Sequence, residues 1–185
     1  MELRERILEV TIEEFNEKNL KFTMDDIAKK LQISKKTIYT MFPDKDTLFL
    51  ETVNYGFGEL KLSEKEILKD KSLDIVEKIK RILIVLPNRY QNIDFRQIHQ
   101  LREKYPKIYR QIERKIESDW DDTIQLLEQA MEQGRIKRIN LALFKMMVEA
   151  TIERFIGNTE LITSGVAYEE ALEQMRDILM DGICI

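Results

Sequence analysis

Apolar residues recur every three or four positions along most of this chain, which is the spacing of one face of an α-helix. The first such face runs from Leu3 to Phe15, and Asn19 follows it as a residue suited to the left-handed end of a helix. Later stripes cover 73–86, 93–104, 108–131, 144–155 and 171–179, the third of them unbroken as far as Gly134. Because no segment alternates cleanly between apolar and polar residues, the pattern predicts an all-α protein of about nine helices without a sheet.

A pair of closely spaced helix starts stands out between the first stripe and the later ones. Thr23 can cap a helix, and Asp26 stands three residues on, as in a capping box. Phe22 precedes that cap and Ile27 occupies the fourth helical position, so the two can form a hydrophobic staple.

The same arrangement returns eleven residues later, with Ser34 as the cap between Ile33 and Ile38. Two stapled starts so close together predict a helix of two turns ending near Leu31, a turn at 32–34, and a second helix ending at Phe42 before a proline. These are the dimensions of a helix-turn-helix.

Charge is distributed unevenly around this motif. The whole chain has a net charge of −4, but residues 27–45 contain five lysines and one aspartate. Lys35, Lys36 and Lys45 fall in the first turns of two successive helices, where the helix dipole disfavours a cation by about 0.3–1 kcal/mol each. Folding alone would favour acidic residues at these helix starts. A bound phosphate would offset the unfavourable interaction of the lysines with the helix dipoles. The pattern therefore favours a nucleic-acid contact over lysines that merely solubilise the surface.

The second helix of the motif offers further groups on its outer side. Thr37, Tyr39 and Thr40 can meet phosphates or base edges while Ile38 points to the core. Tyr39 can equally be a packing aromatic whose hydroxyl stays in water. With the two helix caps, the candidate DNA contacts are Thr23, Ser34, Lys35, Lys36, Thr37, Tyr39, Thr40 and Lys45.

Five short segments of this region together resemble the N-terminal signature of the TetR family of transcriptional regulators. They are TMDDIA at 23–28, ISK at 33–35, IY at 38–39, FP at 42–43 and KDTL at 45–48. The resemblance implies that residues 1–47 bind DNA and that 48–185 form a helical domain for effector binding and dimerisation. Gln32 stands where the family often has glycine in the turn, and Lys36 where a small residue is common.

The remaining residues offer candidates for those two further roles. A dimer needs a self-complementary apolar face, and a ligand pocket needs aromatic walls with polar handles, although each candidate can instead belong to an ordinary core. The candidate interface residues are Met147, Val148, Thr151, Phe155, Leu172, Met175 and Leu179. The candidate pocket residues are Tyr90, Phe95, His99, Tyr109, Trp120 and Phe144.

Composition narrows the remaining function classes. One histidine and one cysteine leave little material for a metal site, and neither a Gly-rich phosphate loop nor an activated-serine motif is present, so we expect no cofactor and no enzyme activity. The longest apolar run, 82–86, is too short to span a bilayer, and Met1 leads directly into a charged helix, so we expect a cytoplasmic protein.

The sequence therefore favours a homodimeric repressor that binds a palindromic operator and is released by a small-molecule effector. A helical protein–protein adaptor without DNA readout, and an enzyme with a pocket in the helical domain, are the alternatives.

Overall fold

The computed structural model describes residues 2–87, 90, 98, 100–157 and 159–185. Within these residues the chain forms eleven α-helices, of which nine have seven residues or more, and a turn of 3-10 helix at Asn19–Lys21. The extended pairing there is confined to one isolated bridge between Ile136 and Cys184. The expected all-α fold is confirmed.

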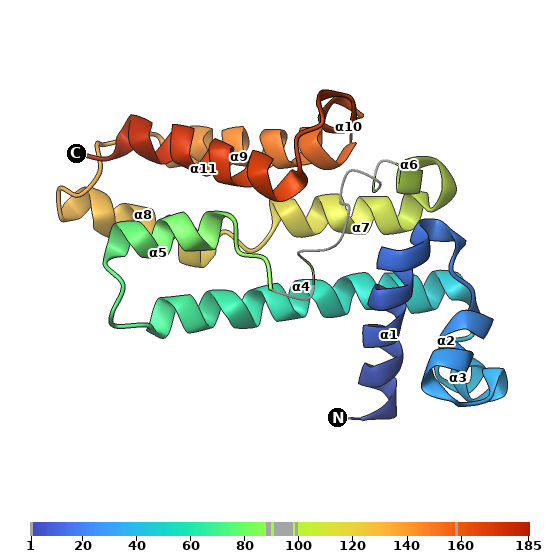
Figure 1. Cartoon of the computed structure of the whole chain (residues 1–185). Helices are drawn as coiled ribbons and strands as arrows, with labels where there is room; N and C mark the ends of the chain where they lie inside the picture. Colours follow the sequence, from blue (N-terminus) through green and yellow to red (C-terminus); the bar gives the residue numbers. More distant parts are fainter. Residues whose placement is uncertain (1, 88–89, 91–97, 99, 158) are drawn as a thin grey trace.

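The N-terminal head consists of three helices whose starts follow from the sequence. These are α1 (Leu3–Lys18), α2 (Met24–Leu31) and α3 (Lys35–Met41), with the 3-10 turn Asn19–Lys21 between the first two. Figure 1 shows α2 and α3 packed beside α1 at one end of the molecule. Their shared core contains Ile7, Phe22, Ile27 and Ile38, each fully buried.

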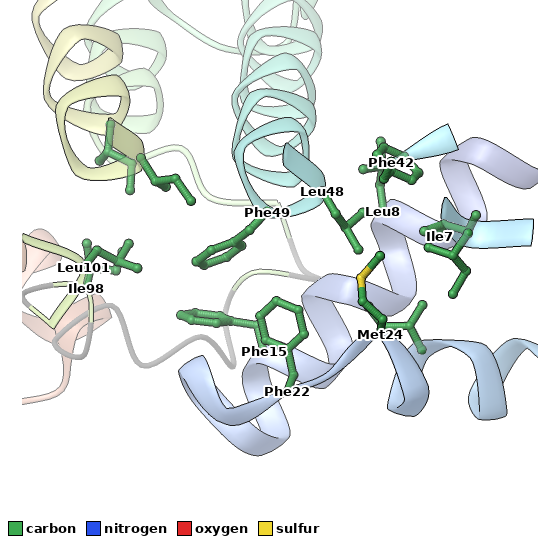
Figure 2. Close-up of a cluster of buried hydrophobic side chains, with 14 of the residues drawn as sticks. Ile7, Leu8, Phe15, Phe22, Met24, Phe42, Leu48, Phe49, Ile98 and Leu101 are labelled. Atoms are coloured by element: carbon green, nitrogen blue, oxygen red, sulfur yellow. The ribbon is translucent and has the colours of Figure 1, made fainter. Parts of the chain in front are cut away.

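Helix α4 (Lys45–Lys69) joins this head to the rest of the chain. Its 25 residues correspond to about 38 Å at the usual rise per residue. Leu48 and Phe49, near its start, are buried in the core of the head, and Figure 2 shows Phe49 facing Phe15 and Phe22 there. Helix α4 is continuous across residues 47 and 48, so it can transmit a displacement between the head and the rest of the chain. The domain boundary expected at this point stays a prediction.

The larger helical domain packs around two cores: Leu101, Ile108 and Ile112 join the core of the head, and a second core lies beyond it. Its longer helices are α5 (Ile75–Leu83), α7 (Pro106–Glu117), α8 (Asp121–Glu132), α9 (Leu141–Gly157) and α11 (Tyr168–Ile183), and its short ones are α6 (Leu101–Lys104) and α10 (Glu160–Ser164). Helices α9 and α11 lie side by side on the side of the molecule away from α4 (Figure 1). Buried Ile79, Leu127, Val148 and Met180 bring α5, α8, α9 and α11 together.

The structure differs from the expected helices in two places. The stripe expected to run unbroken through 108–131 is divided between α7 and α8, because Asp119 adopts a positive φ of 67° that interrupts the helical backbone. The helix expected at 73–86 is shorter, since α5 begins after the capping residue Asp74 and ends at Leu83. The helix expected at 93–104 lies mostly outside the described residues, and α6 covers only its end.

No helix among the described residues is long and apolar enough to cross a membrane.

Candidate functional site

The start of α2 is fixed by the capping box that the sequence predicts. The Asp26 backbone N–H donates to Thr23 Oγ1 over 3.2 Å, and the Thr23 backbone N–H donates to Asp26 Oδ2 over 2.8 Å. Lys18 forms an ion pair with Asp26 at 2.8 Å. The Lys18 ammonium and then the Thr23 hydroxyl lower the pKa of Asp26 to about 2. The carboxylate therefore ties α1 to the first turn of α2.

In the turn between α2 and α3, one residue adopts a strained backbone conformation. Gln32 has φ 55° and ψ 41°, the left-handed conformation that costs most residues other than glycine about 1–2 kcal/mol. Its backbone N–H donates to Lys29 O over 3.1 Å, and that of Ile33 donates to Ala28 O over 3.0 Å, which closes the end of α2. Gln32 therefore takes the conformation for which the family often uses glycine.

Helix α3 begins at the predicted cap and presents most of the candidate contacts on its outer side. Ser34 Oγ accepts from the Thr37 backbone N–H over 3.1 Å and lies 2.8 Å from Thr37 Oγ1. The exposed residues of the helix are Lys35, Lys36, Tyr39 and Thr40, whereas Thr37 is half-buried and Ile38 is fully buried. Tyr39 keeps 47% of its surface exposed.

Two of these outward side chains already have partners in the free protein. Lys35 Nζ lies 2.6 Å from Asp25 Oδ2 of α2. The Thr40 hydroxyl donates to Thr37 O over 2.6 Å, and its oxygen can still accept a hydrogen bond. Six of the eight candidates therefore stand on or at the start of α3, with Thr23 at the start of α2 and Lys45 at the start of α4.

Lys45 is placed differently from the other candidates. Its ammonium donates to Leu20 O and to Phe22 O, each over 2.7 Å, and lies 4.0 Å from the centre of the Phe22 ring. Burial lowers the pKa of this lysine. Since an ammonium has three N–H groups and two are used inside the protein, Lys45 mainly fastens α4 to the segment before α2.

A cavity of about 280 Å³ lies between α4 and the larger domain. Its walls are mostly apolar and come from α1, α4, α5, α6, α7, α8, α9 and α11, together with residues 84–86 that follow α5 and 118–120 that precede α8. Among the expected pocket residues, Tyr90 and Trp120 line it. Phe95 and His99 lie outside the described residues.

The other two expected pocket residues pack elsewhere. Phe144 is buried in the core formed by α5, α8, α9 and α11. Tyr109 is buried against α9, where a Cβ at Gly157 would lie 2.7 Å from its hydroxyl oxygen. Both side chains fill space between neighbouring helices, and neither is on the cavity wall.

The contribution of α4 to the cavity was not predicted from the sequence. Phe49, Val53, Gly56, Leu60 and Glu64 all line it. Their spacing of three or four residues was visible in the sequence. What the sequence did not reveal was that this face meets a cavity instead of a filled core.

The candidate dimer residues divide into buried and surface groups. Val148, Leu172 and Met175 are each at most 7% exposed and belong to the domain's own core. Thr151, Phe155 and Leu179 are half-buried, and Met147 is 48% exposed. Further large apolar side chains, which the sequence analysis did not include, are exposed on the same two helices: Leu143 and Met146 on α9, and Ile178 on α11.

A helix-turn-helix head joined by a long helix to a larger helical domain defines a DNA-binding transcriptional regulator. Residues 7–52 match the family described as bacterial regulatory proteins, tetR family. The chain is 30% identical over 178 residues to the HTH-type transcriptional regulator YvaF of Bacillus subtilis (strain 168), covering 96% of this chain and 94% of that protein. The chain belongs to the TetR family, whose members are regulators and not enzymes.

Solved structures support the same fold. A TetR regulator from Legionella pneumophila matches with a TM-score of 0.67 and 20% identity, covering 98% of this chain and 97% of that one. The TetR-family regulator PfmR from Thermus thermophilus matches with a TM-score of 0.61 and 20% identity, covering 95% and 97%. At these identities the likeness concerns the fold alone.

Proposed function

We propose that this regulator is a cytoplasmic homodimeric repressor that binds a palindromic operator and leaves it when a small molecule enters the cavity. The observation that carries this proposal is the position of the cavity, which touches both the long helix α4 and α1 of the head. A ligand there contacts the DNA-binding part directly.

The second copy is needed because one short recognition helix gives little contact area on DNA. We place the dimer surface on the outer sides of α9 and α11, where Leu143, Met146, Met147 and Ile178 are exposed. Exposed apolar side chains gathered on two adjacent helices are typical of a protein interface. A twofold axis there would present two copies of α3 to successive major grooves.

On the DNA side, α3 provides the reading surface. Lys35 and Lys36 would meet phosphates at the start of the helix, where free backbone N–H groups also favour anions. Thr37, Tyr39 and Thr40 would meet base edges or the sugar–phosphate backbone. Thr23 and Ser34 lie at the starts of α2 and α3, and the third N–H of Lys45 would donate to a phosphate.

Release requires that the ligand bind one arrangement of the heads better than another. Phe49 of α4 lines the cavity and has its ring 5.2 Å from Phe15 of α1 and 5.6 Å from Phe22 before α2. A ligand that displaces Phe49 would therefore also displace Phe15 and Phe22 in the head. The spacing of the two recognition helices would change with them.

Selection of bound duplexes from a random pool tests the DNA part of this proposal. The selected sites should contain an inverted repeat, and affinity for a selected site should fall steeply as salt is raised, because several phosphates are neutralised. Lys36→Ala should weaken binding and reduce the salt slope by about one. Lys71→Ala, an exposed lysine between α4 and α5, is the matched control and should change neither. Absent or salt-independent binding would favour a protein–protein adaptor instead.

The regulatory part is tested with a reporter gene placed behind the selected site. Expression should fall when the regulator is present, which is the outcome for a repressor, and a rise would identify an activator.

A further inference from the structure

The cavity is elongated along α4. Its lining residues on that helix begin at Phe49 and end at Glu64, with Val53, Gly56 and Leu60 between them on the same face. Fifteen residues of α-helix correspond to about 22 Å. A molecule that fills this cavity therefore extends along the helix axis.

The two ends of the cavity have different chemistry. At the head end, the walls are Ile12, Phe15 and Phe49, which are all buried. At the far end, the lining includes Lys61, Glu64 and Asp119. The side chains of Lys61 and Glu64 keep 26% and 15% of their surface exposed, so water reaches this end. The gradient suits an amphiphile whose tail points to the head of the protein.

Lys61 connects the polar groups of the far end. Its ammonium lies 2.7 Å from Glu64 Oε2, donates to Asp119 O over 2.9 Å, and lies 4.0 Å from Asp122 Oδ2. Lys115 also lines the cavity. Two carboxylates, those of Glu64 and Asp122, therefore lie within 4.0 Å of the Lys61 ammonium at this end.

We propose that the cavity binds a cationic amphiphile, with an alkyl chain along α4 and an ammonium head on Glu64. The inference rests on the proposed effector role of the cavity and names the chemistry of the effector.

The surroundings of Lys61 explain why a cation fits better than an anion. An ammonium head that takes Glu64 leaves Lys61 with the Asp119 carbonyl and with Asp122, so Glu64 and Lys61 both keep a partner. Lys115 offers an anion one ammonium group, but a carboxylate head that also took Lys61 would draw it away from Glu64. That would leave a largely buried carboxylate unpaired near Asp119 and Asp122, which is the costly way to break an ion pair.

The pKa of Glu64 also favours a cationic ligand. Burial raises the pKa of Glu64, the Asp122 and Asp119 charges raise it further, and Lys61 opposes the shift. A second cation at this carboxyl would stabilise its ionised form.

The test is calorimetric binding to the full chain without DNA, using dodecyltrimethylammonium and dodecanoate below their critical micelle concentrations and dodecanol below its solubility limit. The dodecyltrimethylammonium ion should bind at least about tenfold more tightly than dodecanoate. Shortening its chain to decyl and octyl should weaken binding by about fourfold per methylene while the chain lies in the apolar part.

Variants assign the head group. Glu64→Gln should weaken binding of the ammonium ion by about tenfold or more and leave that of dodecanol unchanged. Glu66→Gln is the matched control, since Glu66 is exposed on α4 and does not line the cavity. If Glu64→Gln fails to fold by circular dichroism, Asp119→Asn at an exposed position should still reduce ammonium binding, by a smaller factor.

Tighter binding of dodecanoate, or no loss of ammonium binding in these variants, would overturn the cationic head. Affinity independent of chain length would overturn the buried tail. Binding that follows the expected pattern but leaves operator affinity unchanged would support this inference and contradict release of DNA by the ligand.

Discussion

The Lys45 ammonium lies 4.0 Å above the centre of the Phe22 ring and donates hydrogen bonds to the carbonyls of Phe22 and Leu20. One side chain at the start of α4 thus holds the segment that leads into the helix-turn-helix. Phe22 in turn packs edge-on against Phe49, which lines the cavity. The contact therefore links the DNA-binding head to the candidate ligand site.

Lys45→Met is expected to destabilise the protein by about 1–3 kcal/mol, because two carbonyls lose a charged donor and the ring loses its cation. Methionine retains most of the apolar stem, so the loss reports the ammonium. Urea unfolding followed by circular dichroism measures it. Lys36→Ala is the comparison: Lys36 is exposed, and we expect lower DNA affinity with unchanged stability. Equal stability of Lys45→Met and the parent would contradict the structural role of Lys45.

Acid should weaken the junction between α1 and α2 through Asp26. The pKa of this carboxyl is lowered from 3.8 to about 2 in the folded protein, so its ion pair with Lys18 and its bond to Thr23 favour folding above pH 3.8. That contribution is lost as the pH falls from about 4 towards 2. Thermal melts across this range should show a smaller decline for Asp26→Asn than for the parent. The Asp26 side chain keeps 24% of its surface exposed, so we expect the difference to be modest and to shrink in high salt.

The head was predictable from sequence because its signals are local. Each helix start there is marked by a cap within three residues of its partner, as at Thr23 and Ser34, and the structure has both caps. The break at Asp119 was not predictable in this way, since the apolar period continues past it and the left-handed residue is not a glycine. The inward position of Lys45 depends on carbonyls more than twenty residues earlier, which no local pattern reveals.

The same distinction applies to the cavity. Tyr90 and Trp120 were expected on its wall and are there, but Tyr109 and Phe144 are equally aromatic and fill the packing between helices. Whether an aromatic side chain meets a void or a neighbour depends on how complete helices pack. The residue type and the helical spacing of apolar positions do not show which of the two an aromatic side chain will meet.

The turn at Gln32 gives a test of strain. Gln32→Gly should stabilise the protein by about 0.5–1 kcal/mol, because glycine adopts a φ of 55° without the steric cost but is more flexible when unfolded. Gln32→Ala keeps a Cβ and should bring no such gain. Chemical denaturation of the two variants side by side measures the difference. An equal rise in both would mean that the glutamine side chain, and not its backbone conformation, limits stability.

The proposed dimer surface can be tested by placing a charge on it. Met146 and Ile178 are 63% and 74% exposed, so glutamate at either position should fold normally as a monomer. In a dimer, the same glutamate would be buried near its own symmetry mate without a partner, which costs several kcal/mol. We therefore expect Met146→Glu and Ile178→Glu to sediment as monomers and to lose high-affinity binding to the inverted repeat while keeping weak binding to a half-site. Leu62→Glu on α4 is the matched control, since Leu62 is 63% exposed outside the proposed surface. A dimer that survives both substitutions would place the interface on other helices.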